Sequence, residues 1–211
     1  MQSFAPVEMG LAKSLGRPGG NVTGVAFVAD TYAGKVIDLL RATRTGLQRI
    51  GICHAPDNRL SQFFHDGWKT VADRARVTLV KLPWPNTVGE VDATLAAALH
   101  ERVQAVEFGG NRALRGAGWE RICAWALQNK VLTSAGTNGD GEAMLGFGAN
   151  GPHFFGLLMD QLDRVLRGAK PADLPIQMPS LYDIIVNKRQ LQAIGIMVPT
   201  VVLLQATVVF E

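Results

Sequence analysis

Short apolar runs alternate with amphipathic segments along most of this chain. Apolar runs with strand character occupy residues 21–28, 48–54, 77–82, 103–108, 131–134, 144–148 and 181–187. Segments with helical spacing of apolar positions occupy residues 6–15, 31–45, 57–76, 87–102, 152–167 and 188–194, and a further helix ends near residue 130. This alternation predicts an α/β fold with a mainly parallel sheet and helices on both faces.

Polar or glycine-rich loops follow several of these apolar strands. In an α/β sheet the carboxyl ends of the strands carry the binding loops, so polar side chains there can converge on a small ligand. The candidate ligand-binding residues are His54, Asp57, Asn58, Ser61, Trp84, Asn111, Thr137, Asn138 and Asn150. Trp84, between two prolines, could supply a flat apolar wall, although a surface role explains it equally well. Exposure alone also makes loops polar, so both explanations remain open.

Composition excludes several classes of protein. The chain has 211 residues, of which 47% are hydrophobic and 18% charged, as in a globular protein with a substantial core. Its net charge is only +3 and its basic residues are scattered, so we expect no nucleic-acid partner. The longest uncharged apolar stretch, residues 198–210, is too short to span a bilayer. Cys53 and Cys123 form no Cys-x-x-Cys pair and are expected to be small core residues.

Motifs for catalysis or cofactor binding are weak. Gly146-x-Gly148-x-x-Gly151 matches the dinucleotide fingerprint between a strand and a helix. No acidic residue follows at the position expected for a ribose contact, and Pro152 removes an N–H that a phosphate could use. The four histidines lie on different elements and form no metal-ligand pair. We therefore expect no catalytic residues, no metal site and no cofactor.

Six segments resemble one family in order and spacing. They are residues 6–24 (PVEMGLAKSLGRPGGNVTG), 34–40 (GKVIDLL), 47–52 (LQRIGI), 164–175 (RVLRGAKPADLP), 182–188 (YDIIVNK) and 193–199 (AIGIMVP). Together they resemble the solute-binding proteins of bacterial ABC uptake transporters, in the branch with the type 1 periplasmic-binding fold. The resemblance implies a non-enzymatic, two-lobed clamp, hinged by three crossovers, that closes on small amino-acid-like solutes, aromatic ones included. It also implies a periplasmic location and delivery of the solute to an ABC permease.

The resemblance also implies a division of the chain into lobes. On this chain it predicts a first-lobe remnant (1–28, a helix and a strand), a second lobe (29–147), a crossover and helix of the first lobe (148–179), a return strand and helix of the second lobe (180–195), and an apolar C-terminal segment (196–211). Relatives carry a signal peptide and on the order of 100 further first-lobe residues ahead of this stretch. The first residues here lack a basic region and an apolar core, so the chain as given would be cytoplasmic if it is the complete product.

The loops depart from the family pattern where a ligand would be met. His54-Ala-Pro56 replaces an Asn-Pro, and Gly109-Gly-Asn111 replaces a Pro-Asp or Thr-Asp loop. We expect a homo-oligomer that associates through the first-lobe remnant and residues 198–210, because an apolar strand edge is a template for pairing with another chain. Two alternatives remain: a self-associating intracellular module with a vestigial ligand site, and a nucleotide-binding enzyme fragment that uses the Gly146 to Gly151 loop.

Overall fold

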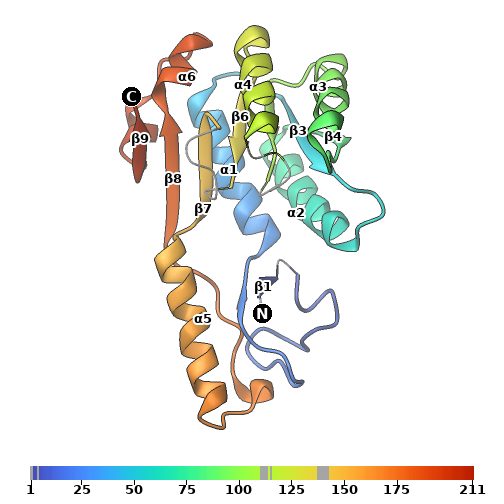
Figure 1. Ribbon diagram of the computed structural model, residues 1–211, viewed down its shortest axis with the longest axis vertical. Coiled ribbons are helices and arrows are strands. Elements are labelled where there is room, and N and C mark those ends of the chain that lie inside the picture. The colour runs from blue at the N-terminus through green and yellow to red at the C-terminus, as the bar shows by residue number, and fades with distance from the viewer. Residues whose placement is uncertain (1, 4, 110–113, 115, 137–142) are drawn as a thin grey trace.

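A seven-stranded sheet forms the centre of the computed structural model, which describes residues 2–3, 5–109, 114, 116–136 and 143–211 (Figure 1). The strand order is β4-β3-β5-β6-β7-β8-β9. The strands are β3 (Arg49–His54), β4 (Thr78–Pro83), β5 (Ala105–Glu107), β6 (Leu132–Ala135), β7 (Leu145–Ala149), β8 (Tyr182–Asn187) and β9 (Val208–Phe210). The pairing is parallel except between β7 and β8. The predicted α/β fold with a mainly parallel sheet is confirmed.

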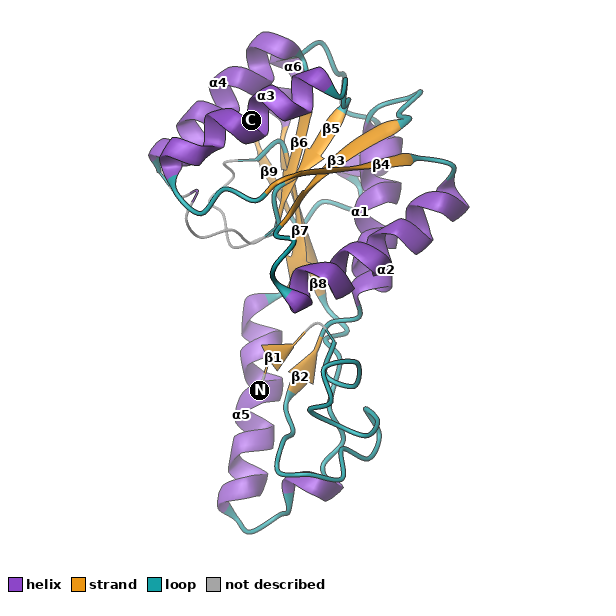
Figure 2. Ribbon diagram, turned by 90° about the vertical axis from the view of Figure 1, so that its right-hand side faces the viewer, coloured by secondary structure: helices purple, strands orange, loops and turns teal. Residues whose placement is uncertain are grey.

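Helices cover both faces of this sheet (Figure 2). The helices are α1 (Ala29–Thr43), α2 (Arg59–Ala75), α3 (Val91–His100), α4 (Ala117–Asn129), α5 (Gly151–Leu166), α6 (Lys188–Ala193) and α7 (Thr200–Leu203), with 3₁₀ turns at Val88–Glu90 and Pro171–Asp173. One face packs on α1 and α2, and the other on α3 and α4. Neighbouring strand residues alternate between the two cores, as Ile52 and Cys53 do. Within the described ranges, no helix has both the length and the hydropathy needed to cross a bilayer.

A smaller part, consisting of β1 (Gln2–Ser3), β2 (Val25–Ala26), α5 and their loops, lies below the carboxyl ends of the parallel strands (Figures 1 and 2). We call the seven-stranded sheet with its covering helices the larger part. In the smaller part β1 and β2 pair in parallel, and the amide of Ala26 donates to the carbonyl of Gln177 at 2.8 Å. The Phe27 and Phe154 rings stack with centroids 5.4 Å apart, which joins β2 to α5. The smaller part is thus built from two separate segments of the chain, and three crossovers join it to the larger part.

The helix predicted over residues 6–15 is wrong, because this segment forms turns. Gly10 adopts a φ of +72°, a conformation that continues no right-handed helix. The amides of Leu11 and Ala12 both donate to the carbonyl of Pro6, at 2.9 and 3.1 Å, which closes a compact turn there. The strand predicted over 21–28 is correspondingly short, with only Val25 and Ala26 in ladder pairing. Helical spacing of apolar residues therefore does not produce a helix in this glycine-rich segment.

The apolar C-terminal segment, residues 198–210, folds back on its own chain. Val202 of α7 is fully buried beside α1, and β9 pairs in parallel with β8. The amide of Thr207 donates to the carbonyl of Ile184 at 2.8 Å and leads the chain into β9. The strand propensity of the segment is thus used within the chain, at one edge of the large sheet.

Candidate functional site

Four of the predicted site residues gather between the loops that follow β3 and β4. These two strands are parallel neighbours, and His54 pairs with Pro83 at their carboxyl ends. An open cavity of about 720 Å³, here called the β3–β4 cavity, lies between the loops. Its lining includes His54, Asp57, Asn58 and Trp84, together with Lys81. The position of these residues after apolar strands predicted that they converge, because the carboxyl ends of parallel strands meet at one edge of a sheet.

Hydrogen bonds give Asn58 and Ser61 a structural role in this loop. Asn58 Oδ1 accepts from the Ser61 amide at 3.1 Å and so caps the first turn of α2. Ser61 Oγ accepts from the Ala55 amide at 3.0 Å and lies 3.2 Å from His54 Nδ1. Burial, with the nearby Lys81 charge as a second cause, lowers the pKa of His54. Trp84 is half-buried and packs against the core on the α3 and α4 face of the sheet.

Asn150 lies apart from the β3–β4 cavity. It follows β7, which is three strand positions from β3, or about 14 Å at the usual strand spacing. Its Oδ1 accepts from the His153 amide at 3.1 Å and caps α5, while its Nδ2 donates to Asp183. Asn150 thus secures a crossover between the two parts. The other three predicted site residues, Asn111, Thr137 and Asn138, lie outside the described residues.

Two of the three glycines of the dinucleotide-like motif lie in the large sheet. Gly146 and Gly148 are residues of β7 and pair with β8. A Cβ at Gly146 would lie 3.0 Å from the Cβ of Ile185, so glycine permits the close approach of these two strands. The helix that follows begins with the Asn150 cap described above. This geometry gives the motif a packing role.

A buried carboxylate that was not among the predicted site residues lies at the end of β5, an interior strand of the sheet. Glu107 is 2% exposed and accepts from the Gly109 amide at 2.9 Å and from the hydroxyl of Ser134. The Tyr32 hydroxyl lies 3.2 Å from Glu107 Oε1 and 3.3 Å from the carbonyl oxygen of Phe147. Burial raises the pKa of Glu107, and these hydrogen bonds oppose part of that rise. Glu107 is the one charged residue in the run 103–108, and that was the available sequence clue.

Aromatic rings surround Tyr32 where the chain crosses into the larger part. The Tyr32 ring contacts Phe147 at 5.5 Å and Phe64 at 5.9 Å between centroids, and Phe147 stacks on Tyr182 at 5.2 Å. These residues come from α1, α2, β7 and β8, so one cluster joins the three crossover segments to the core. Within the described residues no group of three or more His, Cys, Asp or Glu side chains is arranged to hold a metal ion.

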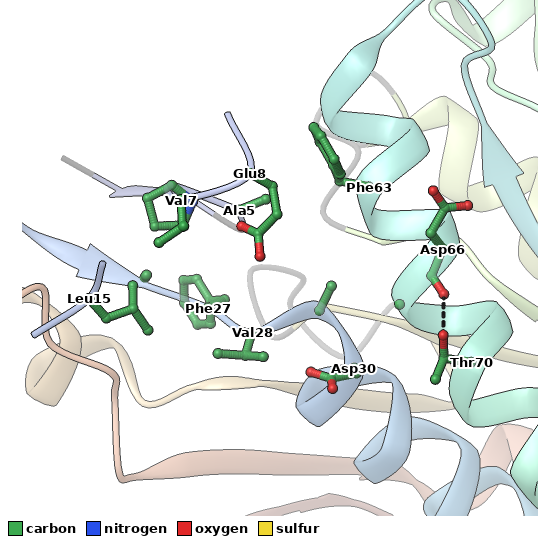
Figure 3. A pocket seen from close by; sticks show the side chains of 14 residues that line it. Ala5, Val7, Glu8, Leu15, Phe27, Val28, Asp30, Phe63, Asp66 and Thr70 are labelled. Carbon is green, nitrogen blue, oxygen red and sulfur yellow. Dashed lines mark hydrogen bonds between the residues drawn. The ribbon is translucent and has the colours of Figure 1, made fainter. Parts of the chain in front are cut away.

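A second cavity, of about 420 Å³, lies between the smaller and larger parts, and we call it the hinge cleft (Figure 3). It is lined by residues 5–8, which follow β1, by residues 26–30, where the chain passes from β2 to α1, and by one side of α2. Gly67 makes this junction possible, because a Cβ there would lie 2.9 Å from the Cβ of Ala29. The cleft therefore lies where a relative movement of the two parts would change its width.

The walls of the hinge cleft combine aromatic rings with carboxylates. Phe27 comes from the smaller part and Phe63 from α2, while Glu8 and Asp30 lie on opposite sides of the space (Figure 3). Arg59 spans the two parts, because its Nη2 donates to the carbonyl of Glu8 at 3.2 Å and its guanidinium lies over the Phe63 ring at 5.4 Å. None of these residues was a predicted contact. Their sequence clue was position, since Glu8 and Phe27 lie in or beside the family-like segment 6–24.

Three solved structures share this fold. A conserved domain protein from Vibrio cholerae has a TM-score of 0.82 and 21% identity, covering 98% of this chain and 69% of that one. The ABC domain in complex with L-Trp from Streptococcus pneumonia has a TM-score of 0.80 and 24% identity, covering 97% and 68%. A ligand-free, open substrate-binding protein with adhesive properties from Clostridium difficile has a TM-score of 0.72 and 21% identity, covering 100% and 70%.

Sequence comparison identifies the family as well as the fold. No curated protein matches the chain. The model of the family described as ABC transporter substrate binding protein matches residues 2–210, which is nearly the whole chain. The three structural relatives are longer, since the chain spans about 70% of each. Because the family match runs through both the smaller and the larger part, this chain belongs to the ABC transporter substrate-binding protein family.

Proposed function

We propose that this chain binds a small amino-acid-like solute in the hinge cleft and presents it to an ABC permease. The observation that carries the proposal is the position of the cleft, whose walls come from both parts and from the β2–α1 crossover. A cavity of about 420 Å³ lies within the size range of small-molecule sites. The family is one of solute-binding proteins, not enzymes. Function with a permease would place the protein outside the cytoplasm.

The arrangement of the chain supports a clamp. The chain passes between the two parts at residues 28–29, 149–151 and 181–182. In the proposed clamp, residues 1–28 and 148–179 belong to one lobe, and residues 29–147 and 180–195 to the other. The Arg59 contact with Glu8 and Phe63 bridges these lobes at the cleft. Ligand binding would shift the population toward a closed form to the extent that the solute contacts both lobes.

Relatives support the class of solute. The structure from Streptococcus pneumonia is a complex with L-Trp. The rings of Phe27 and Phe63 offer aromatic contacts in the hinge cleft of this chain. A larger solute could extend past the start of α2 into the β3–β4 cavity. We propose that Asp57 and Trp84, beside His54, would contact it there. An aromatic amino acid or a similar molecule fits this lining.

Isothermal titration calorimetry with the 20 standard amino acids and their amides and amines tests the proposal. We expect saturable binding of at least one aromatic member and a loss of about tenfold or more in affinity with Phe63→Ala, since an aromatic contact contributes about 0.5–1.5 kcal/mol beyond its buried area. Leu99→Ala is the control, because Leu99 is 44% exposed on α3, lines neither cavity and lies outside the surfaces proposed for self-association. Absence of binding by every compound would overturn the proposal.

A second proposed property is self-association, which the exposed apolar surface favours. Phe155, Met159, Leu162 and Leu166 form a stripe along α5, and the side chains of β9 are exposed at one edge of the large sheet. Such surfaces are uncommon on soluble monomers and mark interaction sites. We propose that a second copy covers them in a homo-oligomer. Multi-angle light scattering at micromolar concentration tests this, and a monomer of about 23 kDa at every concentration would contradict it.

A further inference from the structure

The charged side chains of the hinge cleft have one sign. Among the described lining residues, those with a charge are Glu8, Asp30 and Asp66, all carboxylates. Figure 3 places the Glu8 carboxylate on the side of the N-terminal segment and that of Asp30 on the side of α1, with the cavity between them. Asp66, on α2, directs its carboxylate away from this space in the same view. Two carboxylates therefore face a cavity whose remaining walls are mainly apolar.

The hydrogen bonds of the fold occupy these two carboxylates only in part. Asp30 Oδ1 accepts from the Thr31 amide at 2.9 Å, as an acidic residue in the first turn of a helix commonly does. Within the described chain, no side chain or amide donates a hydrogen bond to the Glu8 carboxylate, although the Glu8 carbonyl accepts from Arg59. Arg59 is therefore held at the edge of the cleft through a backbone atom, and its guanidinium is not among the groups that line the cavity.

The Arg59 contact shows that a cation is accommodated at this edge. Its guanidinium lies 5.4 Å from the centre of the Phe63 ring, within the range for a cation–π interaction. The electron-rich ring face and the carboxylates act in the same direction, because both attract positive charge. A carboxylate on a ligand would meet repulsion from Glu8 and Asp30, which is about 1 kcal/mol per close charge pair at these exposed positions.

We propose that the hinge cleft selects a primary or secondary amine with a flat apolar body, and that a free carboxylate on the solute weakens binding. This inference rests on the proposed function, because it names the class of solute for the same cleft. The ammonium group would lie between Glu8 and Asp30, and the apolar body would lie against Phe27 and Phe63. The charge of the solute, in addition to its ring, thus determines affinity.

Three compounds with the same ring and different charge test the inference by calorimetry on the full chain. Phenethylamine carries a cation, L-phenylalanine carries both charges, and phenylacetate carries an anion. We expect phenethylamine to bind at least tenfold more tightly than phenylacetate, with L-phenylalanine between them. Binding of L-phenylalanine or phenylacetate as tight as that of phenethylamine overturns the inference and leaves the proposed function standing. Absence of binding by these three and by the amino-acid panel overturns both.

Variants that neutralise Glu8 or Asp30 test whether these two carboxylates cause the preference for a cation. Glu8→Gln and Asp30→Asn preserve side-chain size, and we expect each to weaken phenethylamine binding about three- to tenfold without weakening phenylacetate binding. Asp160→Asn is the matched control, because Asp160 pairs with Arg164 on the exposed surface of α5 and lines no part of the cleft. Equal melting temperatures confirm that the variants are folded. If the double variant Glu8→Gln/Asp30→Asn binds phenethylamine as tightly as the parent chain, the inference is wrong.

Discussion

Two helices of nearly equal length, α1 and α5, are buried to very different extents. Both carry an apolar stripe, over 15 residues in α1 and 16 in α5. Seven residues of α1 are buried, including Val36, Ile37 and Leu40, whereas the buried residues of α5 are Phe154 and Gln161. The difference is one of partners: α1 lies on the large sheet beside α2, and α5 lies at the edge of the small two-stranded sheet. An apolar stripe thus predicts a helix and leaves open whether another surface covers it.

The largest expected effect is on the stability of the fold, and it differs between substitutions in the two helices. Leu40→Ala in α1 should lower the free energy of unfolding by about 2–5 kcal/mol, because Leu40 is fully buried and its removal leaves a cavity. Leu166→Ala in α5 should change it by less than about 0.5 kcal/mol, because Leu166 is 76% exposed. Urea denaturation followed by circular dichroism measures both values. Equal losses would show that α5 is covered in solution.

The next effect concerns the hydrogen bonds of Glu107. Glu107→Ala should destabilise the fold by about 1–3 kcal/mol, since the Ser134 hydroxyl and the Gly109 amide lose their acceptor. Glu107→Gln, which keeps an acceptor oxygen, should cost less. Thermal melts of the two variants and the parent chain provide the comparison, and no difference between Ala and Gln would contradict a role for the hydrogen bonds.

The same side chain predicts a pH dependence. Burial raises the pKa of Glu107 in the folded chain above its ordinary value, so the folded state binds this proton more tightly than the unfolded state. Its contribution to stability is therefore fully present below the ordinary carboxyl pKa and is lost as pH rises through the raised value. Melts between about pH 4 and pH 8 should show that the stability of Glu107→Gln relative to the parent improves with pH. A constant difference would exclude the effect.

A smaller effect is expected on assembly. Leu162→Asp on the α5 stripe and Val209→Asp on β9 place a charge on exposed apolar surface, so each should weaken self-association by about tenfold or more with little loss of stability. Light scattering across a concentration series measures the dissociation constant. Asp163→Asn, on the same helix in an ion pair with Arg167, is the control. If neither Asp variant shifts the constant, neither surface is the interface.

The smallest effect concerns the link between the two parts. Arg59→Ala removes the contacts with the Glu8 carbonyl and the Phe63 ring, which are worth about 1 kcal/mol or less at this exposed position. Global stability should change little, but amides of residues 9–12 should exchange faster with solvent, because the turn they form loses its bridge to α2. Hydrogen exchange with mass spectrometry resolves this segment. Unchanged exchange would mean that the turn is held by its own hydrogen bonds.

The candidate site was partly predictable. His54, Asp57 and Trp84 converge because parallel strands place their carboxyl ends together, a rule that needs no coordinates. Asn58 and Asn150 were chosen for the same reason but act as helix caps, which sequence position does not separate from ligand contact. Glu8 and Phe63 were not found, because they lie 55 positions apart and only the packing of the N-terminal turn against α2 brings them to one cleft.

What the sequence by itself determined is the local order of elements and the family. Apolar positions with a period of two or with helical spacing indicate which face of a segment is apolar. From these patterns the sequence predicted the elements from α1 to α6 and the parallel sheet. The tertiary structure decided the rest. It paired β9 with β8, buried Glu107 and left the α5 stripe exposed. Each of these depends on contacts between distant residues, and burial is a property of the partner surface as much as of the segment itself.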